Sequence, residues 1–93
     1  MKRILKFINY IDREGIDAII KELEKFKIDE FSLLDKPQKV IIIDEKPYYL
    51  SGPMFNKTVL RAKLYNEIED KFMQHNQATI NTAIKEFVNS ITK

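Results

Sequence analysis

Four consecutive β-branched residues at positions 40–43, Val-Ile-Ile-Ile, constrain the fold of this chain more than any other feature of its sequence. Branching at Cβ restricts a side chain in a helix and suits the pleated surface of a sheet, so the run predicts a strand. Residues 44–47 then predict a turn, and residues 48–50 the returning strand of a β-hairpin at about 39–51. Because a lone hairpin is only marginally stable in water, helices or a second subunit must cover its apolar face.

Helical periodicity predicts two helices before the hairpin. In residues 2–13 the polar side chains Lys2, Lys6 and Asn9 share one stripe with Arg13, and six apolar residues lie on the wider remainder: Ile4, Leu5, Phe7, Ile8, Tyr10 and Ile11. The sequence at 13–15 breaks this pattern, and a second helix is predicted from Ile16 to about residue 27. A short acidic segment follows at 29–35, and the pair Lys36-Pro37 after it predicts a loop.

The last helix is predicted by apolar residues that recur at helical spacing: Ile80, Ile84, Phe87, Val88 and Ile91. Either Asn76 or Thr79 would accept a hydrogen bond from the free N–H groups at its start. The sequence therefore predicts one α+β domain over 1–93, with two N-terminal helices, the central hairpin and two C-terminal helices.

Length and composition exclude several classes of protein. The chain has 93 residues, no Cys and one His, so it has no disulfide, no thiolate metal site and no zinc site with two imidazoles. We expect no cofactor. The longest apolar run, 40–43, is far shorter than the ~20 residues of a membrane span, and no secretory signal is recognisable, so we expect a cytoplasmic protein without membrane contact.

The segment 54–74 has two interpretations, which differ at residues 57–64. As one long helix, it places Leu60, Leu64 and Ile68 in an apolar stripe, but Lys57 and Arg61 project onto the same face. As a strand over 57–64 followed by a shorter helix, it alternates between apolar and basic side chains. The sequence leaves this choice open.

In the strand interpretation, the motif Lys-Thr-Val-Leu-Arg-Ala-Lys-Leu at 57–64, followed by Ile-Asn-Thr-Ala-Ile-Lys-Glu-Phe-Val at 80–88, resembles the ribbon-helix-helix DNA-binding family over residues 57–92. The resemblance implies a homodimer whose paired strands enter the major groove of DNA. It implies that Val59, Arg61 and Lys63 face the groove, and that Asn76 at the start of the next helix lies against phosphate.

Charge is unevenly distributed along the chain. The totals of 16 Lys+Arg and 14 Asp+Glu are nearly equal, but residues 12–45 hold six basic and ten acidic residues, whereas 46–66 hold four basic and no acidic ones. In the acid-free segment, cations such as Lys46 and Lys57 alternate with aromatic residues such as Tyr48. Cations that meet phosphate and rings that stack on bases are typical of nucleic-acid binding.

Catalytic patterns are weak. The string Asp44-Glu45-Lys46, with Asp35 upstream, contains the residue types of a metal-dependent nuclease, but a solvated turn explains it better. His75 has no neighbouring nucleophile, and a capping or exposed role suits it better than general base catalysis. We therefore expect a small non-enzymatic binding protein without a metal site. The first hypothesis is a DNA-binding regulator that uses residues 46–66; the alternative is a protein-interaction module, such as a phage or plasmid inhibitor or accessory subunit.

Overall fold

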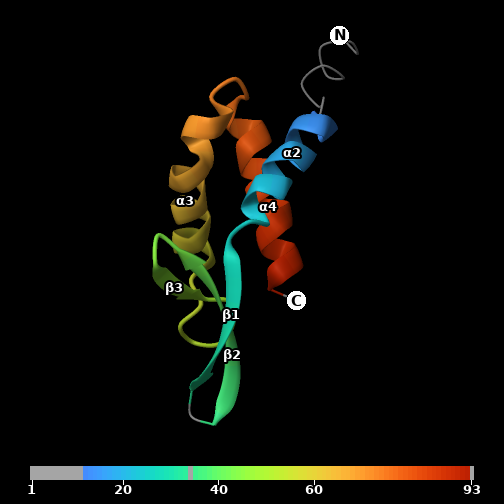
Figure 1. The fold of residues 1–93 in the computed structure, drawn as a ribbon. Helices are drawn as coiled ribbons and strands as arrows, with labels where there is room; N and C mark the ends of the chain where they lie inside the picture. The colour runs from blue at the N-terminus through green and yellow to red at the C-terminus, as the bar shows by residue number, and fades with distance from the viewer. Residues whose placement is uncertain (1–11, 34, 93) are drawn as a thin grey trace, which may run out of the picture.

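The computed structural model describes residues 12–33 and 35–92, which form three α-helices and one three-stranded antiparallel sheet. Figure 1 shows the helices together at one end and the hairpin of the first two strands projecting away from them. In chain order the elements are α2 (Arg13–Leu23), β1 (Lys27–Leu33), β2 (Lys36–Ile43), β3 (Lys46–Tyr49), α3 (Lys57–Ile68), the 3₁₀ turn η1 (Glu69–Phe72) and α4 (Gln77–Ile91).

The β-branched run lies at the end of β2, where that strand has a neighbour on both sides. Val40 is paired with Asp29 of β1 and with Tyr49 of β3, and the side chains of Val40, Ile41 and Ile43 are buried. The predicted hairpin between β2 and β3 is present. Its two-residue turn, Asp44 and Glu45, has φ values of 53° and 64°. Positive φ at both positions is the geometry of a type I′ turn, which matches the twist of the strands.

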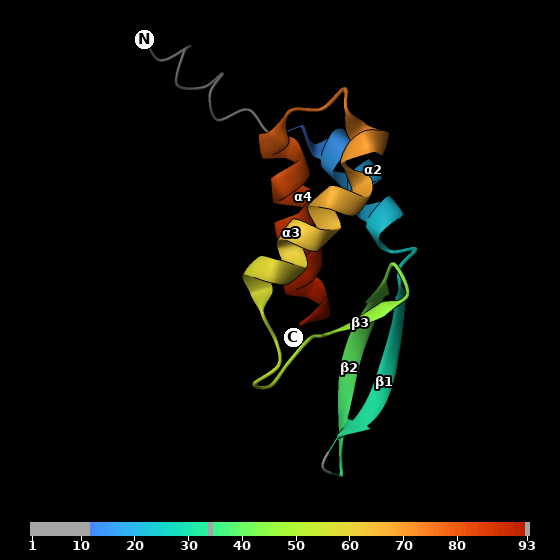
Figure 2. The ribbon, with the colours of Figure 1, turned by 90° about the vertical axis from the view of Figure 1, so that its left-hand side faces the viewer.

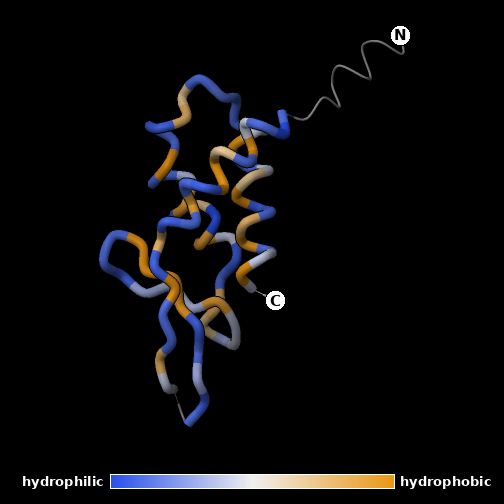
Figure 3. The backbone as a smooth tube through the Cα atoms, turned by 45° about the vertical axis from the view of Figure 1, so that its right-hand side comes forward, coloured by the Kyte–Doolittle hydropathy of each residue, from blue (hydrophilic) through white to orange (hydrophobic). Residues whose placement is uncertain are grey.

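The hydrophobic core joins all three helices to the inner end of the sheet. In Figure 3 hydrophobic segments recur along the helices. Removal of apolar side chains from water at this end provides the main driving force for folding. The core side chains are Ile16, Ile19, Leu23, Ile41, Ile43, Leu50, Leu60, Leu64, Ile68, Ile80, Ala83, Ile84, Phe87 and Val88.

The predicted architecture of two helices, a hairpin and two helices is wrong. The described residues contain one helix before the sheet, and the sheet has a third strand, β1, between the predicted second helix and the predicted loop at Lys36-Pro37. Strand β1 has few buried side chains, so it lacks the apolar alternation that would have revealed it. The predicted helix at 2–13 lies outside the described residues, apart from its last two positions.

Pro37 does not interrupt β2, although the sequence predicted a loop there. It is paired with Ser32 of β1, while β3 covers β2 only at the positions of Val40–Ile43. At Pro37 the strand therefore has β1 on one side only, and a strand edge tolerates a residue that cannot donate a ladder hydrogen bond.

The predicted break at 13–15 is also wrong, because these residues form the first turn of α2. The Asp12 side chain accepts a hydrogen bond from the Gly15 N–H (3.0 Å) and caps the helix. A Cβ atom on Gly15 would lie 2.8 Å from Cε1 of His75, so a larger residue there would require the His75 side chain to move. The helix ends at Leu23, earlier than predicted.

Residues 57–64 are helical, so the strand interpretation is wrong and the paired ribbon has no strand from which to form. Leu60, Leu64 and Ile68 are buried on one face of α3, and the Asn56 side chain caps the helix through the Val59 N–H. The two cations that favoured a strand lie outside the core. Lys57 is exposed in the first turn of α3, and Arg61 is half-buried at the border of the core. No helix in the described part of the chain is long and apolar enough to cross a membrane.

Candidate functional site

The acid-free segment 46–66 is divided between β3, the following loop and α3. Lys46 is exposed at the start of β3, and Tyr48 packs against the core with part of its side chain accessible. The seven predicted site residues therefore do not form one surface.

On α3 the predicted residues point in different directions. Val59 and Lys63 are each two positions from Arg61, which places them on nearly the opposite side of the helix. The Lys63 ammonium lies 3.9 Å from carboxylate oxygens of both Asp44 and Glu67, so its charge is matched locally. Arg61, by contrast, faces α4.

Arg61 lines a groove of about 450 Å³ between α3 and α4. Figure 2 shows α3 crossing in front of α4, and residues from both of these helices line the groove. Small side chains at Thr58 and Ala62 leave this space open. The groove is lined by Thr58, Arg61, Ala62, Tyr65 and Asn66 of α3 and by Gln77 and Asn81 of α4.

The charge of this groove is positive, because Arg61 is basic and none of the seven lining residues is acidic. Arg61 is half-buried, and within the described residues it makes no ion pair or side-chain hydrogen bond. Lys57 lies one helical turn before Arg61, and Lys85 lies one turn after Asn81; both are exposed and have no ion pair in the described part of the chain. The groove therefore presents one cation and several neutral hydrogen-bonding groups to an anionic ligand, with two further cations one helical turn from its lining.

A second recess of about 370 Å³ lies beside the groove and has the opposite charge. Tyr65 and Gln77 line both spaces, so they form the wall between them. The second recess carries Glu69 and Asp70, and His75 also lines it. The site is thus polar along its length, cationic on one side of Tyr65 and acidic on the other.

The first turn of α4 is fixed by Asn76, whose side-chain oxygen accepts a hydrogen bond from the Thr79 N–H (2.8 Å). This capping role was one of the two predicted alternatives. The Asn76 oxygen is therefore already used within the protein, and its effect on the groove is to orient the turn that carries Gln77 and Asn81.

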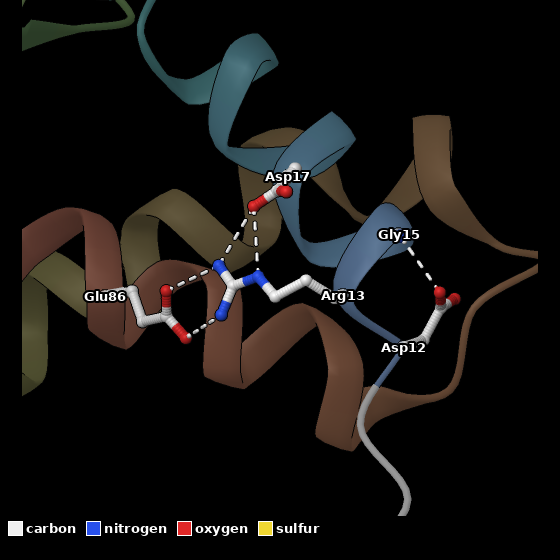
Figure 4. A network of polar contacts seen from close by, with 5 residues as sticks. All are labelled: Asp12, Arg13, Gly15, Asp17 and Glu86. Atoms are coloured by element: carbon white, nitrogen blue, oxygen red, sulfur yellow. Dashed lines mark hydrogen bonds and ion pairs between the residues drawn. The ribbon is translucent and has the colours of Figure 1, made fainter.

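Arg13 connects α2 to α4 and so helps to fix one wall of the groove (Figure 4). Its guanidinium donates two hydrogen bonds to the Glu86 carboxylate, at 2.8 and 3.1 Å, and two to Asp17. The hydrogen bonds to Glu86 raise the pKa of Arg13 most, and those to Asp17 raise it further. The hydrogen bonds from Arg13 in turn lower the pKa of Glu86. A second pair, Lys71 with Glu22 at 2.6 Å, connects η1 to α2 and lowers the pKa of Glu22.

Of the seven residues that line the groove, only Arg61 belongs to the predicted site; the other six, among them Tyr65 and Asn81, do not. The signal for them is a polar or amphipathic stripe at i, i+4 spacing, Arg61 with Tyr65 and Gln77 with Asn81, beside each apolar stripe. Only the crossing of the two helices brings these stripes together.

A metal centre finds no support in the described residues, where no three His, Cys, Asp or Glu side chains come together. Asp44 and Glu45, considered above as metal ligands, form the exposed β2–β3 turn. Comparison with known proteins adds no assignment: no protein-family model matches the chain, and no curated protein or solved structure is significantly similar to it.

Proposed function

We propose that this protein binds nucleic acid through the groove between α3 and α4. The observation that carries the proposal is the acid-free lining of the groove, in which the half-buried cation Arg61 lies among three carboxamides and Tyr65. The role remains that of a small cytoplasmic regulator without catalytic activity, as expected from the sequence. The binding surface differs, because the α3–α4 groove replaces the paired strands of a ribbon.

The residue types in the groove suit the chemistry of a nucleic acid. A guanidinium donates to phosphate oxygens or to the O6 and N7 atoms of guanine, and Asn or Gln pairs with the N6 and N7 atoms of adenine. Lys57 and Lys85 would contact the phosphate backbone on either side, which contributes affinity without sequence preference. The Tyr65 ring supplies a surface on which a base can stack.

A matched pair of substitutions on α3 tests this proposal. Arg61→Gln and Lys63→Gln each remove one positive charge from the same helix, but only Arg61 faces the groove. Fluorescence anisotropy with labelled DNA and RNA, single-stranded and duplex, should show that Arg61→Gln weakens binding about tenfold or more, the equivalent of a lost charged hydrogen bond. Lys63→Gln should bind as the parent chain does. Equal effects of the two substitutions, or no binding by the parent chain, would refute the proposal.

A second candidate function, a protein-interaction module, is favoured by strand β1. It is an edge strand with the apolar side chains Ile28 and Phe31 exposed at 43% and 38%. Unpaired backbone groups along such an edge can accept a strand from another chain, including a second copy of this protein.

The oligomeric state tests this second candidate. If β1 pairs with its counterpart in a homodimer, analytical ultracentrifugation should give a dimer for the parent chain and a monomer for Phe31→Lys. Ser32→Lys, on the opposite face of the same strand, is the control for added charge. A monomeric parent chain at high micromolar concentration would exclude the self-pairing form of this function.

A further inference from the structure

We propose that the α3–α4 groove is a site for single-stranded nucleic acid, in which one unpaired base enters between the two helices. This inference rests on the nucleic-acid function proposed above and specifies its ligand. It is argued from the concave shape of the groove, the position of Tyr65 and the distribution of charge around it.

The shape of the groove favours an unpaired base over a duplex. In double-stranded DNA the base edges lie at the floor of a major groove about 8.5 Å deep, so a protein reads them with side chains that project from a ridge. Here Arg61 and Tyr65 are half-buried on the walls of a recess of about 450 Å³. That volume is typical of small-ligand pockets, and a base released from the stack can enter it.

Tyr65 is suited to stack on the entering base. Its side chain packs against the hydrophobic core on one side and lines the groove on the other. Contact with the core restricts the ring, so little conformational entropy is lost when a base stacks on it. Base–aromatic stacking of this kind tolerates any sequence, because every base has a π face.

The carboxamides around the ring would hydrogen-bond the edge of the base. Asn66 comes from α3, whereas Gln77 and Asn81 come from α4, so the base would be contacted from both walls. Each carboxamide has two donors and one acceptor, which allows the groups to adapt to different base edges.

The charge distribution determines where the sugar–phosphate backbone would lie. Arg61 lines the groove, and Lys57 and Lys85 each lie one helical turn from a groove residue, whereas Glu69 and Asp70 line the recess beyond Tyr65. Phosphates would be attracted to the first side and repelled from the second. The strand therefore passes along the cationic side, and the base points toward the wall formed by Tyr65 and Gln77.

A base-stacking reporter provides the first test. The chain has no Trp, so Tyr65→Trp introduces a single indole at the stacking position. Addition of a single-stranded oligonucleotide of about 16 nucleotides, an upper limit for one small binding site, should quench the indole fluorescence. The same strand annealed to its complement should bind at least tenfold more weakly and quench little.

Substitutions in the groove provide the second test. Tyr65→Leu should weaken single-strand binding by roughly 5- to 150-fold, the range measured for loss of one stacked base, whereas Tyr65→Phe should retain binding. Asn81→Ala, at an exposed position, should weaken binding without affecting the core, so the test does not depend on the folding of Tyr65→Leu. Lys63→Gln is again the control.

The outcomes separate this inference from the function on which it rests. If duplex binds as tightly as single strand and Arg61→Gln weakens both, the groove is a nucleic-acid site but the single-strand inference is wrong. If neither nucleic acid binds, both proposals are wrong. If poly-glutamate binds with the same dependence on Arg61, both are also wrong, and the groove takes an acidic protein. Unchanged binding by Tyr65→Leu and Asn81→Ala would also refute the inference that a base inserts between the two helices.

Discussion

For the substitution Gly15→Ala, helix propensity predicts a gain in stability and the structure predicts a loss. In the interior of an open helix, replacement of Gly by Ala stabilises by about 1 kcal/mol. Gly15 is buried in the first turn of α2, and a Cβ atom there would lie 2.8 Å from Cε1 of His75 and closer still to the Asp12 carboxylate. Both neighbours would have to move.

The expected magnitude follows from the contacts that would be lost. Displacement of Asp12 breaks the cap on the Gly15 N–H, which costs about 1 kcal/mol, and overpacking against His75 costs about 1–3 kcal/mol. After subtraction of the gain of about 1 kcal/mol in propensity, Gly15→Ala should destabilise the protein by about 1–3 kcal/mol. The melting temperature of a domain of this size falls by about 4–8 °C for each kcal/mol.

Thermal unfolding followed by circular dichroism measures this change, with two controls. Ala18→Gly, at an exposed position of the same helix, should cost only the propensity difference of about 1 kcal/mol. In the double variant Gly15→Ala/His75→Ala, removal of the imidazole should recover part of the lost stability, since the effects of substitutions at contacting residues are not additive. A Gly15→Ala protein that is more stable than the parent chain would show that the helix start does not approach His75 as described.

Three further predictions concern stability. Because the folded-state pKa values of Glu86 and Glu22 are lowered by their hydrogen bonds to Arg13 and Lys71, these pairs contribute stability above the ordinary carboxyl pKa of about 4.3, and the contribution is lost as the pH falls through the lowered values. The fall in melting temperature below about pH 4.3 should therefore be shallower in Glu86→Gln. Glu45→Gly should stabilise by up to about 1 kcal/mol in urea unfolding, because Glu45 has φ of 64° in a type I′ turn that favours Asp-Gly. Leu64→Ala, at a fully buried position, should cost about 2–5 kcal/mol in the same assay.

Side-chain pattern predicted the elements in which most apolar side chains are buried. Ile80, Ile84 and Phe87 are buried on one face of α4, and three of the four residues of the β-branched run are buried in β2. Strand β1 could not be recognised in this way, because its pairing with β2 depends on backbone hydrogen bonds that any residue except proline can donate. Its exposed side chains carry almost no pattern.

The candidate site was predictable only in part for a related reason. Arg61 was selected because it lies in an acid-free segment, but its partners at the groove, such as Asn81, depend on how α3 crosses α4. That crossing is determined by the packing of side chains on both helices, which a single amphipathic stripe does not specify. Lys63 belongs to the same segment and has the same charge type, yet the β2–β3 turn places Asp44 beside it.

The ion pairs separate the cations of this protein into two groups, and this separation predicts how strongly salt should affect binding. Arg13, Lys63 and Lys71 are each held near carboxylates. Arg61 in the groove, and Lys57 and Lys85 one helical turn from groove residues, make no ion pair within residues 12–33 and 35–92. If these last three are the contacts to phosphate, the logarithm of the affinity for a single strand should fall with the logarithm of salt concentration at a slope near −2, about −0.7 for each contact. Arg61→Gln should reduce the slope to about −1.4, while Lys63→Gln should leave it unchanged. A slope of −4 or steeper would mean that cations outside the groove, such as those of the projecting hairpin, also contact the backbone, and the groove would then be only part of the binding surface.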